Sequence, residues 1–469
     1  MKGVIIKSLL FIIFSNSVFG QDLPQTLNAE QVLQIVRNFH PIVRQANIGI
    51  EKSQAEILNA RGNFDPFLIY YFGQKKFNNV DYYTDNSPEL NIPTWYGVDL
   101  FAGIENLSGS RLDPTQTFGK SSYLGLNIPL LKNLIFDKRR AYLQQAKVYN
   151  SISKAEQHLM INDLCMEAIT AYWEWVKAYQ IYKVVESNVI INERRLNLIR
   201  RTIEGGERPA IDSIEAITQL QSFQYAKNES WLAFQNAGLQ LSTFMWTKEN
   251  EPYNLPESVV PDENWANEVI LKNYTVSLTD LLFEANNNHP FLNIYKYKLE
   301  VLKIEKKLKF QELLPRVDLR YSFLAKDYYL QRAIDQPSLF QDNYQMGLKV
   351  EVPLFFSQGR ANYKTAKLKI EDTRLEQNQK QLAIQLKVKA YFNEYINLTN
   401  QLSLLIQNVN NYLQLVKAEE TRFANGESSL FLINSRENKA LEAQEKLIEV
   451  RANYFKSIYA MQWSAGLLK

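Results

Sequence analysis

The chain reads RAYLQQAK at residues 140–147 and RANYKTAK at residues 360–367, which lie 220 positions further on (360 minus 140). It also reads NFHP at residues 38–41 and NNHP at residues 287–290, which lie 249 positions further on (290 minus 41). Such self-similarity indicates a repeated structural unit. We therefore expect the chain to be an internal duplication.

The two offsets also indicate where the repeats differ in length. They differ by 29 (249 minus 220), so the first repeat holds 29 extra residues between Pro66 and Arg140. We expect the first repeat at residues 21–255 and the second at residues 256–469.

Each repeat is dominated by a long helix, expected at residues 138–204 in the first repeat and 359–424 in the second. Its apolar positions alternate steps of four and three residues, as at Val148, Ile152 and Ala155. A period of 3.5 residues is typical of helices that pack as coiled coils. About 66 residues at 1.5 Å per residue give a helix of roughly 100 Å, far longer than the helix of an ordinary globular domain.

Two shorter helices complete each repeat, and together they roughly equal the long helix in length. The opening helix is predicted to run from Asn28 to about residue 60 in the first repeat and over residues 277–312 in the second. Asn28 and Ser277 are favourable N-caps. The closing helices are predicted at residues 210–247 and 428–466.

The chain has to reverse direction between the long helix and the closing helix. Residues with a permissive backbone lie at this point in both repeats: Gly205, Gly206, Asn425 and Gly426. We expect them to form the turn at the tip of each helical hairpin.

Between the opening helix and the long helix, the hydrophobic period changes from 3.5 to 2. Val317, Leu319 and Tyr321, for example, alternate with polar and charged residues. Runs of about 9–11 residues suit tilted strands that cross a bilayer, although a sheet packed on a soluble core would alternate in the same way. The predicted strand pairs lie at about residues 66–77 and 119–130 and at about residues 315–326 and 343–353.

The segment 78–118 alternates too, but the flanking helices must lie on one side of the membrane, so the number of crossings has to be even. We expect this segment mainly as a long external loop with room for an extended strand. Four strands per protomer cannot close a barrel, and open edges are not tolerated in lipid. Three copies would give twelve strands around a passage. The predicted fold class is therefore mixed: an all-α coiled-coil barrel plus a transmembrane β-barrel.

The N-terminus has the pattern of a signal peptide at residues 1–20. Lys2 and Lys7 precede a short apolar run, and small and polar residues follow up to Gly20. This pattern is typical of exported proteins. The apolar run is shorter than the ~20 residues that a membrane anchor needs.

The composition excludes several classes of function. The 53 basic and 50 acidic residues nearly balance, and no basic run suggests nucleic acid as a partner. Cys165 is the only cysteine, so neither an intramolecular disulfide nor a thiolate metal cluster is expected. Since the sequence contains no nucleophile–base motif, metal-ligand spacing or phosphate loop, we expect no enzyme, no cofactor and no metal site.

Several motifs resemble those of TolC-like outer-membrane efflux proteins. The run LNAEQV at residues 27–32, followed by His40-Pro41, is similar to the opening helix of that family. Similar too are LLP at residues 313–315, PLF at residues 353–355 and NGESS at residues 425–429. Each motif alone is weak, but their order covers nearly the whole chain.

The resemblance implies a homotrimer whose twelve-stranded barrel in the outer membrane continues into a periplasmic α-barrel. Such a protein is the passive exit channel of a tripartite efflux pump or a type I secretion system. The implied partners are a periplasmic adaptor protein, an inner-membrane transporter and the lipid of the outer membrane.

In that family, acidic residues after the second tip turn can form a ring at the closed pore. The corresponding residues here are Leu432 and Ser435, so the ring is absent at these positions. The equivalent residues of the first repeat are Asp212 and Glu215, one helical turn apart. They could line a periplasmic constriction and favour cations, or simply stabilise a helix N-terminus through its dipole.

One alternative function remains open, that of a periplasmic coiled-coil adaptor or scaffold protein without a transmembrane barrel. Such a protein would show one helical hairpin and no duplicated strand pairs. The prolines at the predicted helix–strand junctions also count against a purely coiled-coil protein: Pro66, Pro129, Pro315 and Pro353.

Overall fold

The computed structural model describes residues 26–111, 113, 116–263, 277–328 and 343–468. The predicted signal peptide lies outside these residues. The chain divides into two compact units, and each takes segments from both halves of the sequence. Unit 1 comprises residues 1–36, 168–275 and 402–453, and unit 2 comprises residues 37–167, 276–401 and 454–469.

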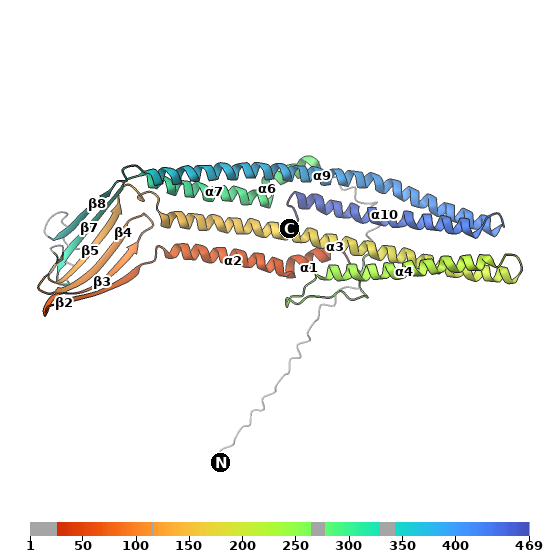
Figure 1. Cartoon of the computed structure of the whole chain (residues 1–469), viewed down its shortest axis with the longest axis horizontal. Helices are drawn as coiled ribbons and strands as arrows, with labels where there is room; N and C mark the ends of the chain where they lie inside the picture. The colour runs from red at the N-terminus through yellow and green to blue at the C-terminus, as the bar shows by residue number, and fades with distance from the viewer. Residues whose placement is uncertain (1–25, 112, 114–115, 264–276, 329–342, 469) are drawn as a thin grey trace, which may run out of the picture. The chain divides into compact units, whose positions relative to one another are not determined.

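Unit 2 contains an antiparallel sheet of six strands, which are neighbours in the order of the sequence (Figure 1). The strands are β2 (Phe67–Phe77), β3 (Val80–Pro93), β4 (Asp99–Ser108), β5 (Gly119–Pro129), β7 (Arg316–Lys326) and β8 (Tyr344–Glu351).

Two of these strands correct the prediction of four strands per protomer. The segment 78–118, expected mainly as an external loop, contains β3 and β4, which pair with each other and with β2 and β5. The prediction required an even number of strands in the first repeat, and four strands meet that requirement as well as two. β3 gave no clear signal because it is rich in polar residues and contains Pro88, which cannot donate to a strand ladder.

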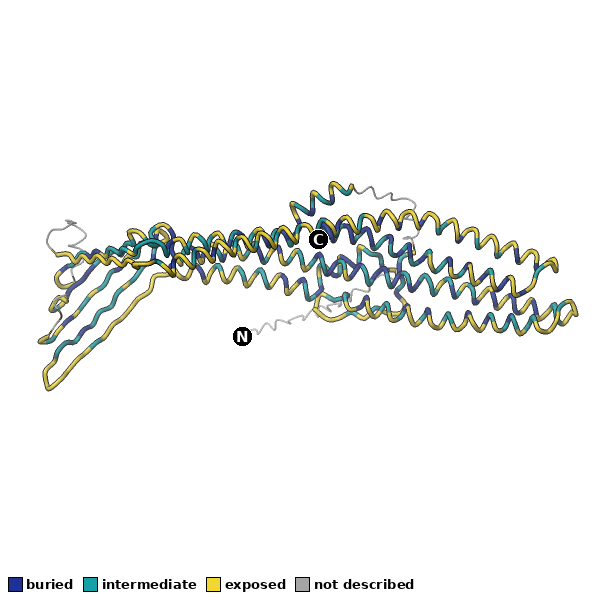
Figure 2. Tube along the Cα trace, turned by 45° about the horizontal axis from the view of Figure 1, so that its top comes forward, coloured by how far each residue is buried: buried dark blue, intermediate teal, exposed yellow. Residues whose placement is uncertain are grey.

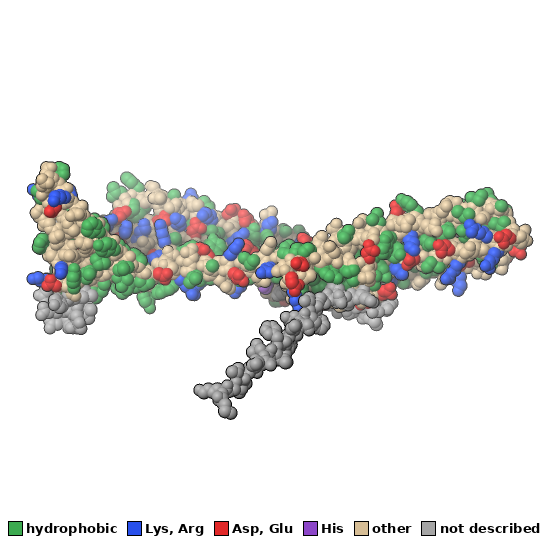
Figure 3. All heavy atoms as spheres, turned by 90° about the horizontal axis from the view of Figure 1, so that it is seen from below, with side chains coloured by type: hydrophobic (Ala, Val, Ile, Leu, Met, Phe, Trp, Pro, Cys, Tyr) green, Lys and Arg blue, Asp and Glu red, His purple; other side chains and the backbone are tan. Residues whose placement is uncertain are grey.

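The strand register separates an apolar face of the sheet from a polar one. Leu100 lies opposite Leu126, which lies opposite Tyr321 on the next strand. One position along, Asp99 lies opposite Asn127 on the other face. Hydrophobic side chains gather over the sheet in Figure 3. One face therefore suits lipid and the other suits water.

The remaining secondary structure of unit 2 is helical. Within this unit, Ile152 and Ala155 pack against Ile294 and Val301, and packing of this kind between helices is what the steps of four and three residues predict. No helix among the described residues is both long and apolar enough to cross a membrane. The helical elements that contribute to unit 2 are α2 (Pro41–Gly62), α3 (Lys138–Glu204), α6 (Leu278–Asn288), α7 (Pro290–Phe310), η1 (Gln311–Leu313), α9 (Ser357–Ala424) and the end of α10 (Leu430–Ser464).

Unit 1 is mainly helical and has an aromatic core. It contains α1 (Ala29–Phe39), α4 (Ile211–Ser242) and the remaining parts of α3, α9 and α10, together with a short parallel pair, β1 (Thr26–Leu27) and β6 (Val260–Pro261). Trp175 is fully buried and stacks on Phe234 with ring centroids 6.0 Å apart.

Both opening helices are interrupted at a His-Pro pair, where the sequence predicts one continuous helix. A residue before proline is driven out of the helical conformation, and proline suits the first position of the helix that follows. The Nδ1 atom of His40 accepts a hydrogen bond from the backbone N–H of Ile42 at 3.2 Å. His289 accepts one from Phe291 at 3.1 Å. The two histidines therefore act as helix caps.

The capping role of His289 predicts a dependence of stability on pH. Burial, together with the charge of Lys387, lowers the pKa of His289 to about 4. The unfolded chain binds this proton near pH 6.5 and the folded chain only near pH 4, so acidification through this window favours the unfolded state. We expect a loss of about 3 kcal/mol per chain.

The midpoint of thermal denaturation, measured between pH 7.5 and pH 4, would test this. His289→Asn keeps a capping acceptor without a titrating group and should flatten the pH dependence. His158→Asn, at an exposed position, is the matched control. An equal pH dependence in all three proteins would contradict the assignment.

Candidate functional site

The tips of the two helical hairpins in unit 1 share one backbone design. The N–H of Glu207 donates to the carbonyl of Thr202 at 3.0 Å, and the N–H of Glu427 donates to the carbonyl of Arg422 at 2.9 Å. This bond pattern closes a helix with a left-handed residue. Gly206 (φ 76°) and Gly426 (φ 80°) occupy that position. The predicted tip turns therefore lie at Gly205-Gly206 and Asn425-Gly426.

Arg208 joins the two tips to each other. Its guanidinium lies 3.5 Å from the ring centroid of Phe423 and donates to the carbonyl of that residue at 2.8 Å. The same guanidinium forms an ion pair with Asp212 at 3.4 Å. The negative charge of Asp212 is therefore partly neutralised by Arg208. The sequence did not predict this ion pair.

The other three predicted tip residues have different surroundings. Glu215 accepts a hydrogen bond from the side chain of Asn434 at 3.3 Å. Glu215 and Ser435 line the same open groove of about 540 Å³ between α4 and α10. Leu432 is 40% exposed. The structure thus brings Glu215 and Ser435 together, whereas Asp212 and Leu432 do not line that groove.

A buried ion pair joins the two helical hairpins of unit 1, between α3 and α10. Two nitrogens of Arg195 on α3 donate to the carboxylate of Glu437 on α10 at 2.6 and 2.5 Å. Arg195 also forms an ion pair with Glu420 on α9 at 2.8 Å. The side chains of Arg195 and Glu437 are only 9% and 4% exposed. Burial opposes the charge of Arg195, but the bonds to Glu437 outweigh it and raise the pKa of the guanidinium.

The sequence did not predict this pair because its members lie 242 residues apart. A charged residue on an otherwise periodic helix gives no sign of its partner. One signal was available, because Asn192 and Arg195 are polar residues three positions apart among buried apolar residues such as Val189 and Ile199.

The predicted junction prolines lie at the ends of strands in unit 2. Pro66 and Pro315 directly precede β2 and β7, Pro129 is the last residue of β5, and Pro353 lies two residues beyond β8. Because proline has no N–H to donate, it is suited to the ends of a strand ladder.

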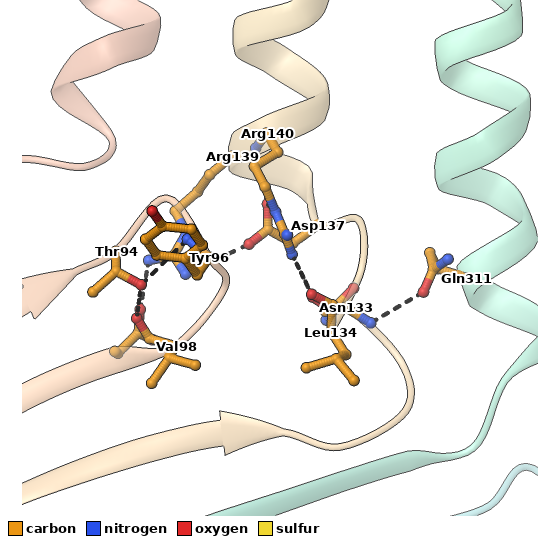
Figure 4. Close-up of polar contacts among 10 residues, drawn as sticks. Thr94, Tyr96, Val98, Asn133, Leu134, Asp137, Arg139, Arg140 and Gln311 are labelled. Atoms are coloured by element: carbon orange, nitrogen blue, oxygen red, sulfur yellow. Dashed lines mark hydrogen bonds and ion pairs between the residues drawn. The ribbon is translucent and has the colours of Figure 1, made fainter.

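A polar network holds the strand ends against the start of α3 (Figure 4). Arg140 donates to the carbonyls of Asn133 and Leu134, each at 2.8 Å. Asp137 caps the helix by accepting from the backbone N–H of Arg140 at 2.8 Å. The N–H of Asn133 donates to the side chain of Gln311 at 3.2 Å. The first and second repeats are thereby joined at the junction.

A cavity of about 690 Å³ opens beside this network. Its charged lining contains both signs, so it shows no preference for a cation or an anion. The acidic residues are Asp99, Asp137, Glu312, Asp318 and Glu351, and the basic residues are Lys132, Lys138, Arg139 and Arg316.

The sequence of the second repeat matches a known family. Residues 282–466 match the family model described as outer membrane efflux protein. No curated protein matches the chain.

The fold of nearly the whole chain matches solved outer-membrane channels. VceC of Vibrio cholerae shares 13% identity, with 93% of this chain and 96% of that one covered and a TM-score of 0.64. The open state of MtrE of Neisseria gonorrhoeae shares 14% identity, with 94% and 89% covered and a TM-score of 0.64. CmeC of Campylobacter jejuni shares 14% identity, with 93% and 85% covered and a TM-score of 0.63. At such identities the likeness establishes the fold.

The buried ion pair leads to a testable prediction. Glu437→Leu leaves Arg195 buried and charged, with only the partly exposed Glu420 as a partner. Removing one partner of a buried ion pair typically costs about 3–5 kcal/mol. The double variant Arg195→Met with Glu437→Leu removes both charges and should recover most of the lost thermal stability.

The exposed pair of Lys446 and Glu449 provides the control. Glu449→Leu should change stability by less than about 1 kcal/mol. A Glu437→Leu variant as stable as the Glu449→Leu control would show that the buried pair does not hold the helices together.

Proposed function

Because the second repeat of this chain has the sequence of an outer membrane efflux protein and the whole chain has the fold of TolC-like channels, we propose that it is the outer-membrane exit channel of a tripartite efflux pump or a type I secretion system. The channel is passive and carries small molecules or exported substrates. Its periplasmic part is helical, and energy comes from an inner-membrane transporter through a periplasmic adaptor.

The two-faced sheet supports this proposal most directly. Apolar side chains on one face, among them Leu68, Leu348 and Val350, are exposed in the single chain. In the outer membrane they contact lipid. An adaptor or scaffold protein without a transmembrane barrel would leave this face in water, where so large an apolar patch is unfavourable.

The open edges of the sheet favour a homotrimer. β2 and β8 each pair with one described strand only, and β2 is exposed along its length in Figure 2. A lipid-exposed edge leaves backbone groups unsatisfied, so copies of the chain pair β8 of one with β2 of the next. Three copies enclose a passage.

The duplication is part of the same proposal. After a signal peptide at residues 1–20, repeats at residues 21–255 and 256–469 each supply an opening helix, strands, a long helix and a closing helix. The matching His-Pro caps and tip turns support two copies of one ancestral unit.

The native mass of the protein, extracted from membranes in detergent, tests this function. We expect three copies per particle and ion conductance after insertion into a planar bilayer. A monomer that stays in solution without detergent would exclude the channel.

The tip residues Asp212, Glu215, Leu432 and Ser435 are proposed to line the periplasmic constriction. Since Asp212 is paired with Arg208, Glu215 supplies most of the free negative charge. We expect Glu215→Ala to lower cation selectivity, with Asp212→Ala adding less. The reversal potential in a salt gradient would measure this.

Glu229→Ala, on the same helix and far from the tip in sequence, is the control for loss of a carboxylate. Unchanged selectivity with a lowered thermal midpoint would assign Asp212 and Glu215 to stabilising the helix end instead.

A further inference from the structure

The extra residues of the first repeat coincide with one structural element. The two repeat offsets differ by 29 residues between Pro66 and Arg140. The hairpin of β3 and β4 runs from Val80 to Ser108, which is also 29 residues. Among the described residues, the first repeat contributes four strands to the six-stranded sheet and the second repeat contributes two. The first repeat is therefore the basic strand pair with a hairpin inserted into it.

The inserted hairpin has the same two faces as the rest of the sheet. On the apolar face, Leu90 lies opposite Ala102, and Ile92 lies opposite Leu100. The apolar face continues onto β5, where Leu124 lies opposite Ala102. Inserted strands that stood outside the membrane would not need this continuous apolar face.

Side chains on the polar face attach the hairpin to its neighbours. The hydroxyl of Tyr123 on β5 donates to Glu89 on β3 at 2.8 Å, and Arg320 on β7 lies 3.6 Å from the same carboxylate. Gly103 on β4 lies opposite Tyr123. A Cβ atom at this position would collide with the tyrosine ring. The ring can therefore lie here because residue 103 is a glycine.

The turn between β3 and β4 lies against the helices rather than at the far end of the strands (Figure 4). Within the turn, the N–H of Thr94 donates to the carbonyl of Val98 at 3.0 Å. Trp95 stacks on Phe64, just beyond α2, with ring centroids 4.0 Å apart. Arg139 at the start of α3 pairs with Asp99 at 2.8 Å. β3 and β4 therefore run the full length of the sheet.

We propose that β3 and β4 are transmembrane strands and that three copies close a barrel of eighteen strands, six from each chain, instead of twelve. This inference rests on the proposed outer-membrane channel. Six is an even number, so β2 and β8 run antiparallel and can pair between copies. Since barrel diameter grows with strand number, the passage through the membrane is wider than four strands per chain would allow.

Single cysteines and a polymer-linked maleimide, too large to enter the lumen, would test the topology on intact cells. Tyr96→Cys, at a position that is 82% exposed in the helix-side turn, should react only after the outer membrane is permeabilised. Ser110→Cys, at the opposite end of β4, should react without permeabilisation. The unchanged chain is the blank because its one cysteine, Cys165, is buried.

The outcomes separate the two proposals. Reaction of both cysteines on intact cells would place the hairpin outside and overturn this inference while leaving an outer-membrane channel. A Ser110→Cys variant that is silent on intact cells would overturn the outer-membrane orientation, and the hairpin topology with it.

A deletion gives a second test with a different readout. Removing residues 80–108 leaves β2 and β5, which are antiparallel, to pair directly as the strands of the second repeat do. Imaging should resolve eighteen strands in the full-length trimer and twelve in a trimer of the shortened chain. Twelve strands in both trimers would contradict the wider barrel.

Discussion

A strand inside a bilayer has no water to satisfy its backbone N–H and C=O groups, and in the proposed channel this constraint decides how the six-stranded sheet is completed. β3, β4, β5 and β7 have a partner on each side, whereas β2 and β8 have one described partner each. In the proposed channel the single chain is therefore incomplete, and closing the barrel requires further copies. The hairpin of β3 and β4 is compatible with such closure, since two additional strands keep the number of strands even and the edge strands antiparallel.

Polar contacts at the junction between β5 and α3 connect the sheet to the helical part of unit 2. Arg140 satisfies two carbonyls of the connection between β5 and α3, and Asp137 caps the helix beside them. Gly97 lies so close to the Arg140 guanidinium that a Cβ atom would collide with it. The turn between β3 and β4 therefore packs against the same arginine that bonds to the connection between β5 and α3.

The two helical hairpins share backbone geometry and differ in side-chain chemistry. The left-handed glycines of the two tips are equivalent, at Gly206 and Gly426. Yet Asp212 and Glu215 of the first repeat correspond to Leu432 and Ser435 of the second, and Arg195 corresponds to Leu415. A buried arginine present in only one repeat can pair with a glutamate from the other. This explains how two similar hairpins acquire a fixed pairing within unit 1.

The sequence by itself determined what depends on local period and on backbone chemistry. Steps of four and three residues predicted the long helices, and glycines marked the tip turns. Strict alternation, as at Val317 and Leu319, predicted β7. These signals are local because helix and strand periods follow from the backbone alone.

Only the tertiary structure decided which distant residues meet. It identified β3, whose polar sequence and Pro88 hide a strand that is stabilised by its neighbours on both sides. It also paired Arg195 with Glu437 and Arg208 with Phe423. Such contacts join helices far apart in the chain, and no single helix carries a pattern that specifies its partner. The break of the opening helix at each His-Pro pair belongs partly to both groups. The proline is a local signal in the sequence, whereas the structure shows that the buried imidazole caps the helix that follows.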